Sequence, residues 1–280
     1  MAEFTPMMQQ YLQTKEEYKD CILFYRLGDF YEMFFEDAEL VSKELELTLT
    51  GKNCGMEERA PMCGIPYHAV EGYLNKLVAN GHKVAICEQV EDPKLAKGLV
   101  KREVIRIVTP GTNLDMQALD ESKNNYIMCI VYLADRYGVS IADVSTGDYY
   151  VTEVDSERKL FDEITKFSPS EIICNESFYM SGVDIEDLRH RLKITIYALE
   201  TWYFGDELAE TTLLTHFKVK SLEALGLADY DCGMIAAGAL LKYLYETQKN
   251  DLNNISVIHP YSTGKYMIID SSTRRNLELV

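Results

Sequence analysis

A short apolar run, Cys21-Ile-Leu-Phe-Tyr-Arg-Leu27, decides how the amino-terminal part of the chain is interpreted. The run is rich in residues that favour strands, and Gly28 ends it. It therefore predicts a buried strand. Asp29 offers an N-cap for a helix that follows, and along this helix one apolar face is expected from residues spaced by three or four: Phe30, Phe34, Ala38, Val41 and Leu45.

The segments on either side of this run indicate a mixed α/β unit. A first helix is expected to begin at Thr5-Pro6, with threonine as the cap and proline at the first helical position, and to end near Tyr18. Residues 69–80 have a helical pattern that closes at Gly81, and residues 83–89 and 103–108 have strand patterns. The unit ends near the Pro-Gly turn of residues 109–112.

A second pattern begins after the polar stretch at residues 115–125. Strand-like runs at residues 126–133, 139–143 and 148–154 are joined by turns short enough for antiparallel hairpins. A helix at 157–167, a short strand at 171–174 and a long apolar helix at 231–248 follow. Three antiparallel strands followed by alternating helices and strands are the opening of a ribonuclease-H-like fold. We therefore expect a second α/β domain.

The end of the chain predicts one more strand, at residues 266–270, and a new helical pattern at residues 273–280. A helix that begins there has no later segment of this chain to pack against. We therefore expect the chain to be the front part of a longer protein.

The composition fits a globular protein of about two domains. The chain has 280 residues, 47% of them hydrophobic, which is enough for a sizeable core. Its seven cysteines are odd in number and contain no Cys-x-x-Cys pair, so neither a disulfide framework nor a zinc ribbon has the spacing it needs. No apolar stretch is long enough for a membrane span, and the first residues lack an export signal. We expect a cytoplasmic protein with no membrane partner.

The charge distribution divides the chain into two halves. The formal net charge of −17 argues against general binding to nucleic acid. Residues 1–115 carry 13 Lys and Arg against 19 Asp and Glu, a net charge of −6, and the rest carries −11. The acidic second half could receive a basic partner protein. Residues 94–106 form a basic run, which is either a solvated face or a surface near phosphate: Lys94, Lys97, Lys101, Arg102 and Arg106.

The sequence lacks the motifs of the common catalytic classes. Gly264-Lys265 is followed by Tyr266 and is no Walker motif, so this chain is expected to have no ATP site and no other cofactor. A two-metal nuclease on a ribonuclease-H-like fold needs carboxylates in the first strand, and residues 126–133 contain none. Asp143 and Asp148 are interpreted as turn and strand-end residues. No two histidines have metal-ligand spacing, so we expect neither catalysis nor a bound metal.

Phe30 and Glu32 have two interpretations. In the first, Asp29 and Glu32 form a capping box, and Phe30 begins the apolar face of a helix. In the second, both side chains reach one ligand. Residues two apart on a helix do not share a face, so the second interpretation requires that Phe30 lie at or before the start of the helix.

Longer motifs favour the second interpretation. They are Thr5-Pro-Met-Met-Gln-Gln-Tyr-Leu12, Phe24-Tyr-Arg-Leu-Gly-Asp-Phe-Tyr-Glu32, Gly64-Ile-Pro-Tyr-His-Ala-Val70, Ala85-Ile-Cys-Glu-Gln89, Val108-Thr-Pro-Gly-Thr112 and Thr273-Arg-Arg-Asn-Leu-Glu-Leu279. In this order they resemble the amino-terminal part of the MutS family of bacterial DNA mismatch-repair proteins, whose hallmark is Phe-x-Glu. The resemblance covers nearly the whole chain. It departs at Leu27, where relatives often have Met, and in the loop of residues 52–59, whose composition is its own.

The resemblance implies a domain organisation. Residues 1–115 resemble the mixed-sheet mismatch-recognition domain, residues 120–252 resemble the ribonuclease-H-like connector domain, and residues 253–280 resemble the start of the helical lever domain. The clamp of the family and its ATPase, which uses ATP and Mg, would lie in a missing carboxy-terminal part.

The resemblance also implies a function and its residues. Phe30 would be a wedge inserted from the minor groove, and Glu32 would hydrogen-bond the displaced base. Weaker candidates for DNA binding are Leu27, Asp29, Lys52 and Met62, with Lys52 and the basic run of residues 94–106 facing phosphates. The implied partners are mismatched duplex DNA, a MutL-type repair protein bound by the connector domain, and further copies of the full-length protein. The implied location is the nucleoid in the cytoplasm.

Overall fold

The computed structural model describes residues 4–91, 98–113 and 124–263 and divides the chain into two compact units. The first unit is Met1–Ala118 with Thr247–Lys249, and the second is Leu119–Glu246 with Asn250–Val280. Each unit contains a six-stranded sheet with both parallel and antiparallel neighbours, flanked by helices. The predicted fold class is therefore confirmed. The strand predicted at 266–270 and the helix predicted at 273–280 lie outside the described residues.

The first unit is built around a sheet in the order β3-β4-β2-β1-β5-β6. Strands β1 and β5 are parallel, and the other neighbours are antiparallel. Its helices and strands are, in chain order, α1 (Pro6–Glu17), β1 (Ile22–Leu27), β2 (Phe30–Phe34), α2 (Phe35–Glu44), β3 (Thr50–Lys52), β4 (Ala60–Pro66), α3 (Val70–Ala79), β5 (Val84–Gln89) and β6 (Arg102–Val108).

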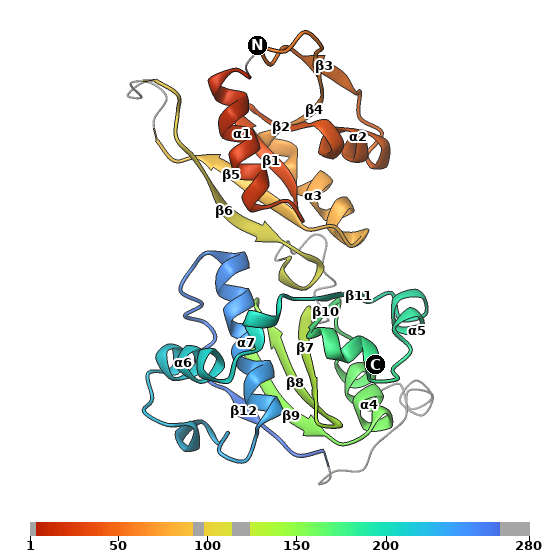
Figure 1. Cartoon of the computed structure of the whole chain (residues 1–280), viewed down its shortest axis with the longest axis vertical. Coiled ribbons are helices and arrows are strands. Elements are labelled where there is room, and N and C mark those ends of the chain that lie inside the picture. The colour runs from red at the N-terminus through yellow and green to blue at the C-terminus, as the bar shows by residue number, and fades with distance from the viewer. Residues whose placement is uncertain (1–3, 92–97, 114–123, 264–280) are drawn as a thin grey trace. The chain divides into compact units, whose positions relative to one another are not determined.

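Helices cover both faces of this sheet (Figure 1). On one face Met8 and Tyr11 of α1 pack against Leu23, Tyr25 and Phe34. On the other face α2 and α3 contribute residues such as Val41 and Leu77 to a second cluster, which contains Phe24, Tyr31 and Met33. A strand buried on both faces has a continuous apolar run instead of an alternating one, which explains why residues 21–27 predicted β1 correctly.

The helix predicted to begin at Phe30 is wrong in its first turn. Residues 30–34 form β2, which pairs with β1 and with β4, and α2 begins only at Phe35. Gly28 has a φ of +59°, and with Asp29 it makes a two-residue turn that reverses the chain. Backbone bonds to two neighbouring strands override the helical spacing from Phe30 to Phe34. The partner strand β4 and the edge strand β3 were not predicted.

The second unit has the sheet order β11-β10-β7-β8-β9-β12. Strands β7, β8 and β9 are antiparallel, while β10 is parallel to β7 and β11 is parallel to β10. Its main elements are β7 (Tyr126–Leu133), β8 (Arg136–Asp143), β9 (Asp148–Val154), α4 (Glu157–Phe167), β10 (Glu171–Cys174), α5 (Ile185–His190), β11 (Thr195–Ala198), α6 (Asp206–Phe217), α7 (Cys232–Gln248) and β12 (His259–Pro260). The first of these strands lies between the second and the fourth, which is the ribonuclease-H-like order.

The first hairpin of this unit is tighter than predicted. Strand β8 begins at Arg136, three residues before the predicted start at residue 139. Ala134 and Asp135 form the turn, and both have positive φ angles, as a two-residue type I′ turn requires. Tyr137 is buried in the core of the unit, and this extends the strand into what the sequence presented as a polar turn.

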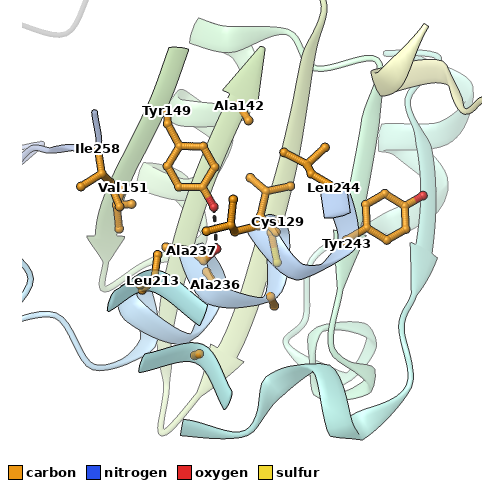
Figure 2. Packing of buried hydrophobic residues seen from close by; sticks show 14 of the residues in the cluster. Cys129, Ala142, Tyr149, Val151, Leu213, Ala236, Ala237, Tyr243, Leu244 and Ile258 are labelled. Atoms are coloured by element: carbon orange, nitrogen blue, oxygen red, sulfur yellow. Dashed lines mark hydrogen bonds between the residues drawn. The ribbon is translucent and has the colours of Figure 1, made fainter. Parts of the chain in front are cut away.

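Helix α7 lies against one face of the second sheet and is almost entirely buried. Tyr149 of β9 donates a hydrogen bond from its hydroxyl to the carbonyl oxygen of Ala237, at 2.5 Å (Figure 2). A Cβ on Gly238 would lie 2.3 Å from the Cα of Ala209, so only glycine lets α7 approach α6 this closely. Burial on more than one side explains why residues 231–248 show no polar face in the sequence.

Asp143 is a structural residue at the end of β8. It is fully buried, and its Oδ1 accepts hydrogen bonds from the backbone nitrogens of Ser145 and Thr146 and from the Ser145 hydroxyl. Its Oδ2 accepts a hydrogen bond from the backbone nitrogen of Asn125. The interpretation of Asp143 as a turn residue is confirmed. Within the described ranges, no group of three or more His, Cys, Asp or Glu side chains could hold a metal ion.

We predict that Asp143→Asn lowers the free energy of unfolding of the second unit by about 1.5–3 kcal/mol, because an amide nitrogen cannot accept the bonds that one carboxylate oxygen accepts. Urea unfolding followed by the fluorescence of Trp202, the single tryptophan, measures the change, since Trp202 lies in this unit. Asp148→Asn, in the partly exposed residue that opens β9, is the control and should change stability by less than about 0.5 kcal/mol. Equal effects of the two substitutions would contradict this role.

Candidate functional site

Phe30 and Glu32 lie on the same face of the first sheet. They are two apart on a strand, where alternate side chains point to the same side. Leu27 pairs with Phe30 across the hairpin, and Met62 of β4 pairs with Phe34, so these residues belong to that face too. The capping-box interpretation is wrong, because Asp29 and Glu32 do not begin a helix. Phe30 precedes α2, as the second interpretation required.

Helix α1 covers only part of this face. Phe34 is 1% exposed, and its ring packs edge-on against Tyr11 of α1, with the centroids 4.9 Å apart. Phe30, two residues earlier on the same strand, is 46% exposed. The sheet therefore has a covered region that anchors β2 and an uncovered region that presents an aromatic ring to solvent.

A pocket of about 460 Å³ opens beside Phe30 on the first unit. Its lining residues are Phe30, Glu32, Leu47, Thr48, Thr50, Met62, Cys63 and Gly64. A Cβ on Gly64 would lie 3.6 Å from Cγ of Glu32 and 3.9 Å from Cδ1 of Phe30, so glycine keeps the space between these side chains open. Sequence reasoning did not single out Leu47, Thr48 or Thr50, because β3 and β4 were not predicted.

Three contacts fix the hairpin that carries Phe30. The Nε of Arg26 donates a hydrogen bond to the carbonyl oxygen of Gly28, at 2.5 Å. The same guanidinium lies 3.8 Å from the centre of the Tyr67 ring, and the Tyr67 backbone nitrogen donates to the carbonyl oxygen of Asp29, at 2.9 Å. The turn is thus attached to the segment after β4, while the Asp29 side chain stays exposed at the tip. The aromatic ring of Phe30 projects from a fixed backbone.

Lys52 binds Glu32. Its Nζ donates to Oε2 of Glu32 at 2.5 Å and lies 5.8 Å from the centre of the Phe34 ring. The lysine side chain is 33% exposed and the glutamate side chain 15% exposed. Lys52 was proposed from the sequence as a phosphate contact, and the structure places it in an ion pair within the site.

The basic run of residues 94–106 is not one exposed surface. Arg102 donates hydrogen bonds to the carbonyl oxygens of Arg26 and Val100 and to the side chain of Gln10. Arg106 donates to the carbonyl oxygen of Thr112, and burial lowers its pKa. Both arginines are used in packing the first unit. Lys101 is exposed and pairs with Glu103, while Lys94 and Lys97 lie outside the described residues.

The cysteines offer no reactive thiol to this site. All seven are unpaired and buried, and burial raises the pKa of Cys63, at the pocket, to about 11. A thiol at this pKa is protonated at neutral pH and is a poor nucleophile. Among the residues that the structure describes, no helix has the length and apolar character needed to cross a membrane.

Comparison with known proteins covers both units. Residues 5–117 match the family model described as MutS domain I, and residues 125–256 match the model described as MutS domain II. The chain is 66% identical over 279 residues to the DNA mismatch repair protein MutS of Lachnoclostridium phytofermentans. It is 53% identical over 282 residues to the protein of the same name from Acetivibrio thermocellus. These matches span 100% of this chain but only 30% and 32% of the relatives' lengths.

The different burial of Phe30 and Phe34 gives a stability prediction. Phe34→Ala should lower the free energy of unfolding of the first unit by about 3–5 kcal/mol, because it leaves a cavity beneath Tyr11. Phe30→Ala removes an exposed ring and should change it by less than about 0.5 kcal/mol. Thermal unfolding followed by circular dichroism compares the two variants. If the Phe30→Ala chain is as unstable as the Phe34→Ala chain, Phe30 is a core residue and its assignment as an exposed site residue is wrong.

Proposed function

The chain belongs to the MutS family, and from this premise we propose that it recognises mispaired and unpaired bases in duplex DNA as the amino-terminal part of a mismatch-repair protein. The observation that carries the proposal is an exposed aromatic side chain, Phe30, beside a carboxylate, Glu32, on an uncovered sheet face. An exposed ring on a fixed hairpin has no role in the core of the unit and is suited to contact a ligand.

Phe30 acts as a wedge that enters the minor groove. An apolar side chain inserted there unstacks a base step, at a cost of a few kcal/mol, and bends the duplex by about 20–90°. A mispaired base is already poorly paired and stacked, so the same deformation costs less at a mismatch. Specificity then comes from the mechanics of the duplex and requires no reading of sequence. The hairpin contacts of Arg26 and Tyr67 support this role, since a wedge must not yield when it meets the base stack.

Glu32 bonds the base that the wedge displaces. It lies on the same face as Phe30 and lines the same pocket, so one displaced base can meet both side chains. A carboxyl group is a hydrogen-bond partner for the polar edge of a base, which Phe30 cannot be. Around this pair, Leu27 and Met62 offer apolar surface, and Asp29 lies exposed at the tip of the hairpin.

The second unit acts as the connector that transmits the signal to a partner protein of the MutL type. Two features support an interaction role: residues 116–280 carry a net charge of −11, from 26 Asp and Glu against 15 Lys and Arg, and β7, the first strand of the fold, has no carboxylate. The longer protein hydrolyses ATP with Mg outside residues 1–280, works as a homodimer or larger assembly, and acts on the nucleoid in the cytoplasm.

The test of the mismatch proposal is binding by a full-length protein of this family that carries residues 1–280. Phe30→Ala should reduce the preference for a duplex with a mispair or an unpaired thymine to about that for perfect duplex, while binding to perfect duplex persists through phosphate contacts. Equilibrium titration of labelled duplexes at fixed salt measures both affinities.

Ile105→Ala is the matched control for this experiment. Ile105 is an apolar residue of β6 at the far edge of the same sheet, and it is 47% exposed, like Phe30. This substitution should leave the preference unchanged. If the Phe30→Ala protein still prefers mismatched DNA, the wedge assignment is wrong.

A further inference from the structure

Lys52 and Glu32 meet across the width of the β3-β4-β2 part of the sheet. Lys52 lies on the edge strand β3, opposite Ala60 of β4, and Glu32 lies on β2, opposite Gly64 of the same strand. The lysine side chain therefore runs along the sheet face to reach the carboxylate at 2.5 Å. Two residues from segments 20 positions apart are joined at the site by this one contact.

The ammonium group of Lys52 is held on two sides. Glu32 binds it through Oε2, and the buried ring of Phe34 lies 5.8 Å away, within the range of a cation–π interaction. Phe34 is itself fixed by Tyr11 of α1. The position of Lys52 is thus defined by the covered part of the sheet, and Lys52 in turn holds the carboxylate in the uncovered part.

This arrangement uses one oxygen of Glu32 and leaves the other available. Within the described part of the chain, Lys52 is the hydrogen-bond partner of Glu32, and it engages Oε2 alone. Glu32 also lines the pocket beside Phe30. The second oxygen, Oε1, is therefore the carboxyl oxygen that Lys52 leaves available to a ligand.

The charge of Lys52 offsets the repulsion between Glu32 and DNA. Duplex DNA carries one negative charge per about 1.7 Å of its axis, so a lone carboxylate that enters the groove is repelled. A lysine bound to that carboxylate cancels its charge at the point of contact. Of the basic residues in the described part of residues 94–106, Arg102 and Arg106 bond to groups within the unit, and Lys101 pairs with Glu103.

On the basis of the proposed function, we propose that Lys52 is a positioning residue for mismatch recognition. It neutralises Glu32 and fixes Oε2, so that Oε1 meets the displaced base, and it acts through Glu32 instead of through a phosphate of its own. A phosphate contact by Lys52 is the alternative, and it makes different predictions for a pair of substitutions.

The experiment is a double-mutant cycle in a full-length protein of this family that carries residues 1–280. Lys52→Met keeps the length of the side chain and removes its charge. It should weaken mismatch binding about tenfold, because an unpaired carboxylate then faces DNA. In a protein that already carries Glu32→Gln, Lys52→Met should change affinity by less than about twofold, since no charge remains to be neutralised. Lys52→Arg keeps the charge and should retain mismatch affinity within about twofold.

Salt dependence separates the two roles. If Lys52 binds a phosphate, Lys52→Met makes the negative slope of log affinity against log salt shallower by about 0.9, with Glu32 present or substituted. Equal effects of Lys52→Met in both backgrounds would overturn the positioning role. Lys83→Met is the control, because it breaks a different ion pair of the first unit, with Asp20, and should leave the mismatch preference intact.

Failure of this inference is distinguishable from failure of the proposed function. If the parent protein binds perfect and mismatched duplex alike, the proposed function is wrong. If the parent discriminates and Phe30→Ala abolishes discrimination, but Lys52→Met acts alike in both backgrounds, the inference about Lys52 alone is wrong.

Discussion

The alternation of side chains along β2 is the constraint on which the site depends. Phe30, Glu32 and Phe34 must share one face, because they are separated by two residues on a strand. Tyr31 and Met33 must then point to the opposite face, where the α2 and α3 side chains bury them. Helix α1 packs against Phe34 but leaves Phe30 uncovered. The same short strand therefore carries a fully buried aromatic residue and an exposed one.

This constraint links the stability of β2 to the exposure of Phe30. The strand is fixed at one end by Phe34 beneath Tyr11 and at the other by the hairpin contacts of Arg26. Neither anchor involves the Phe30 ring, so the fold does not need that ring for its own stability. A side chain that does not pack in the core can be suited to a ligand without loss of stability. Replacing a large core side chain by a small one, in contrast, lowers the free energy of unfolding by several kcal/mol. The ion pair with Lys52, whose ammonium group lies near the anchored Phe34 ring, also holds the Glu32 carboxylate in place.

In the second unit, a buried carboxylate at the end of β8 serves the fold. Its strands have the ribonuclease-H-like order, but β7 contains no carboxylate, and Asp143 is occupied by the turn after β8. Both oxygens of this carboxylate accept hydrogen bonds from the protein and hold the turn. Fold and function are therefore separate questions in this unit.

The sequence by itself determined the α/β class, the order of most elements and the strand at residues 22–27, and it singled out Phe30 and Glu32 as candidate site residues, because apolar runs, turn residues and family motifs are local signals. It did not determine that residues 30–34 form a strand, since the spacing of Phe30, Phe34 and Ala38 is equally helical. Pairing with β1 and β4 decided that, and such pairing depends on segments distant in sequence. For the same reason, only the tertiary structure showed that Lys52 binds Glu32 and that Arg102 and Arg106 donate hydrogen bonds to backbone carbonyl groups of the first unit. The register of the strands determines which charged side chains meet, and the sequence does not show that register.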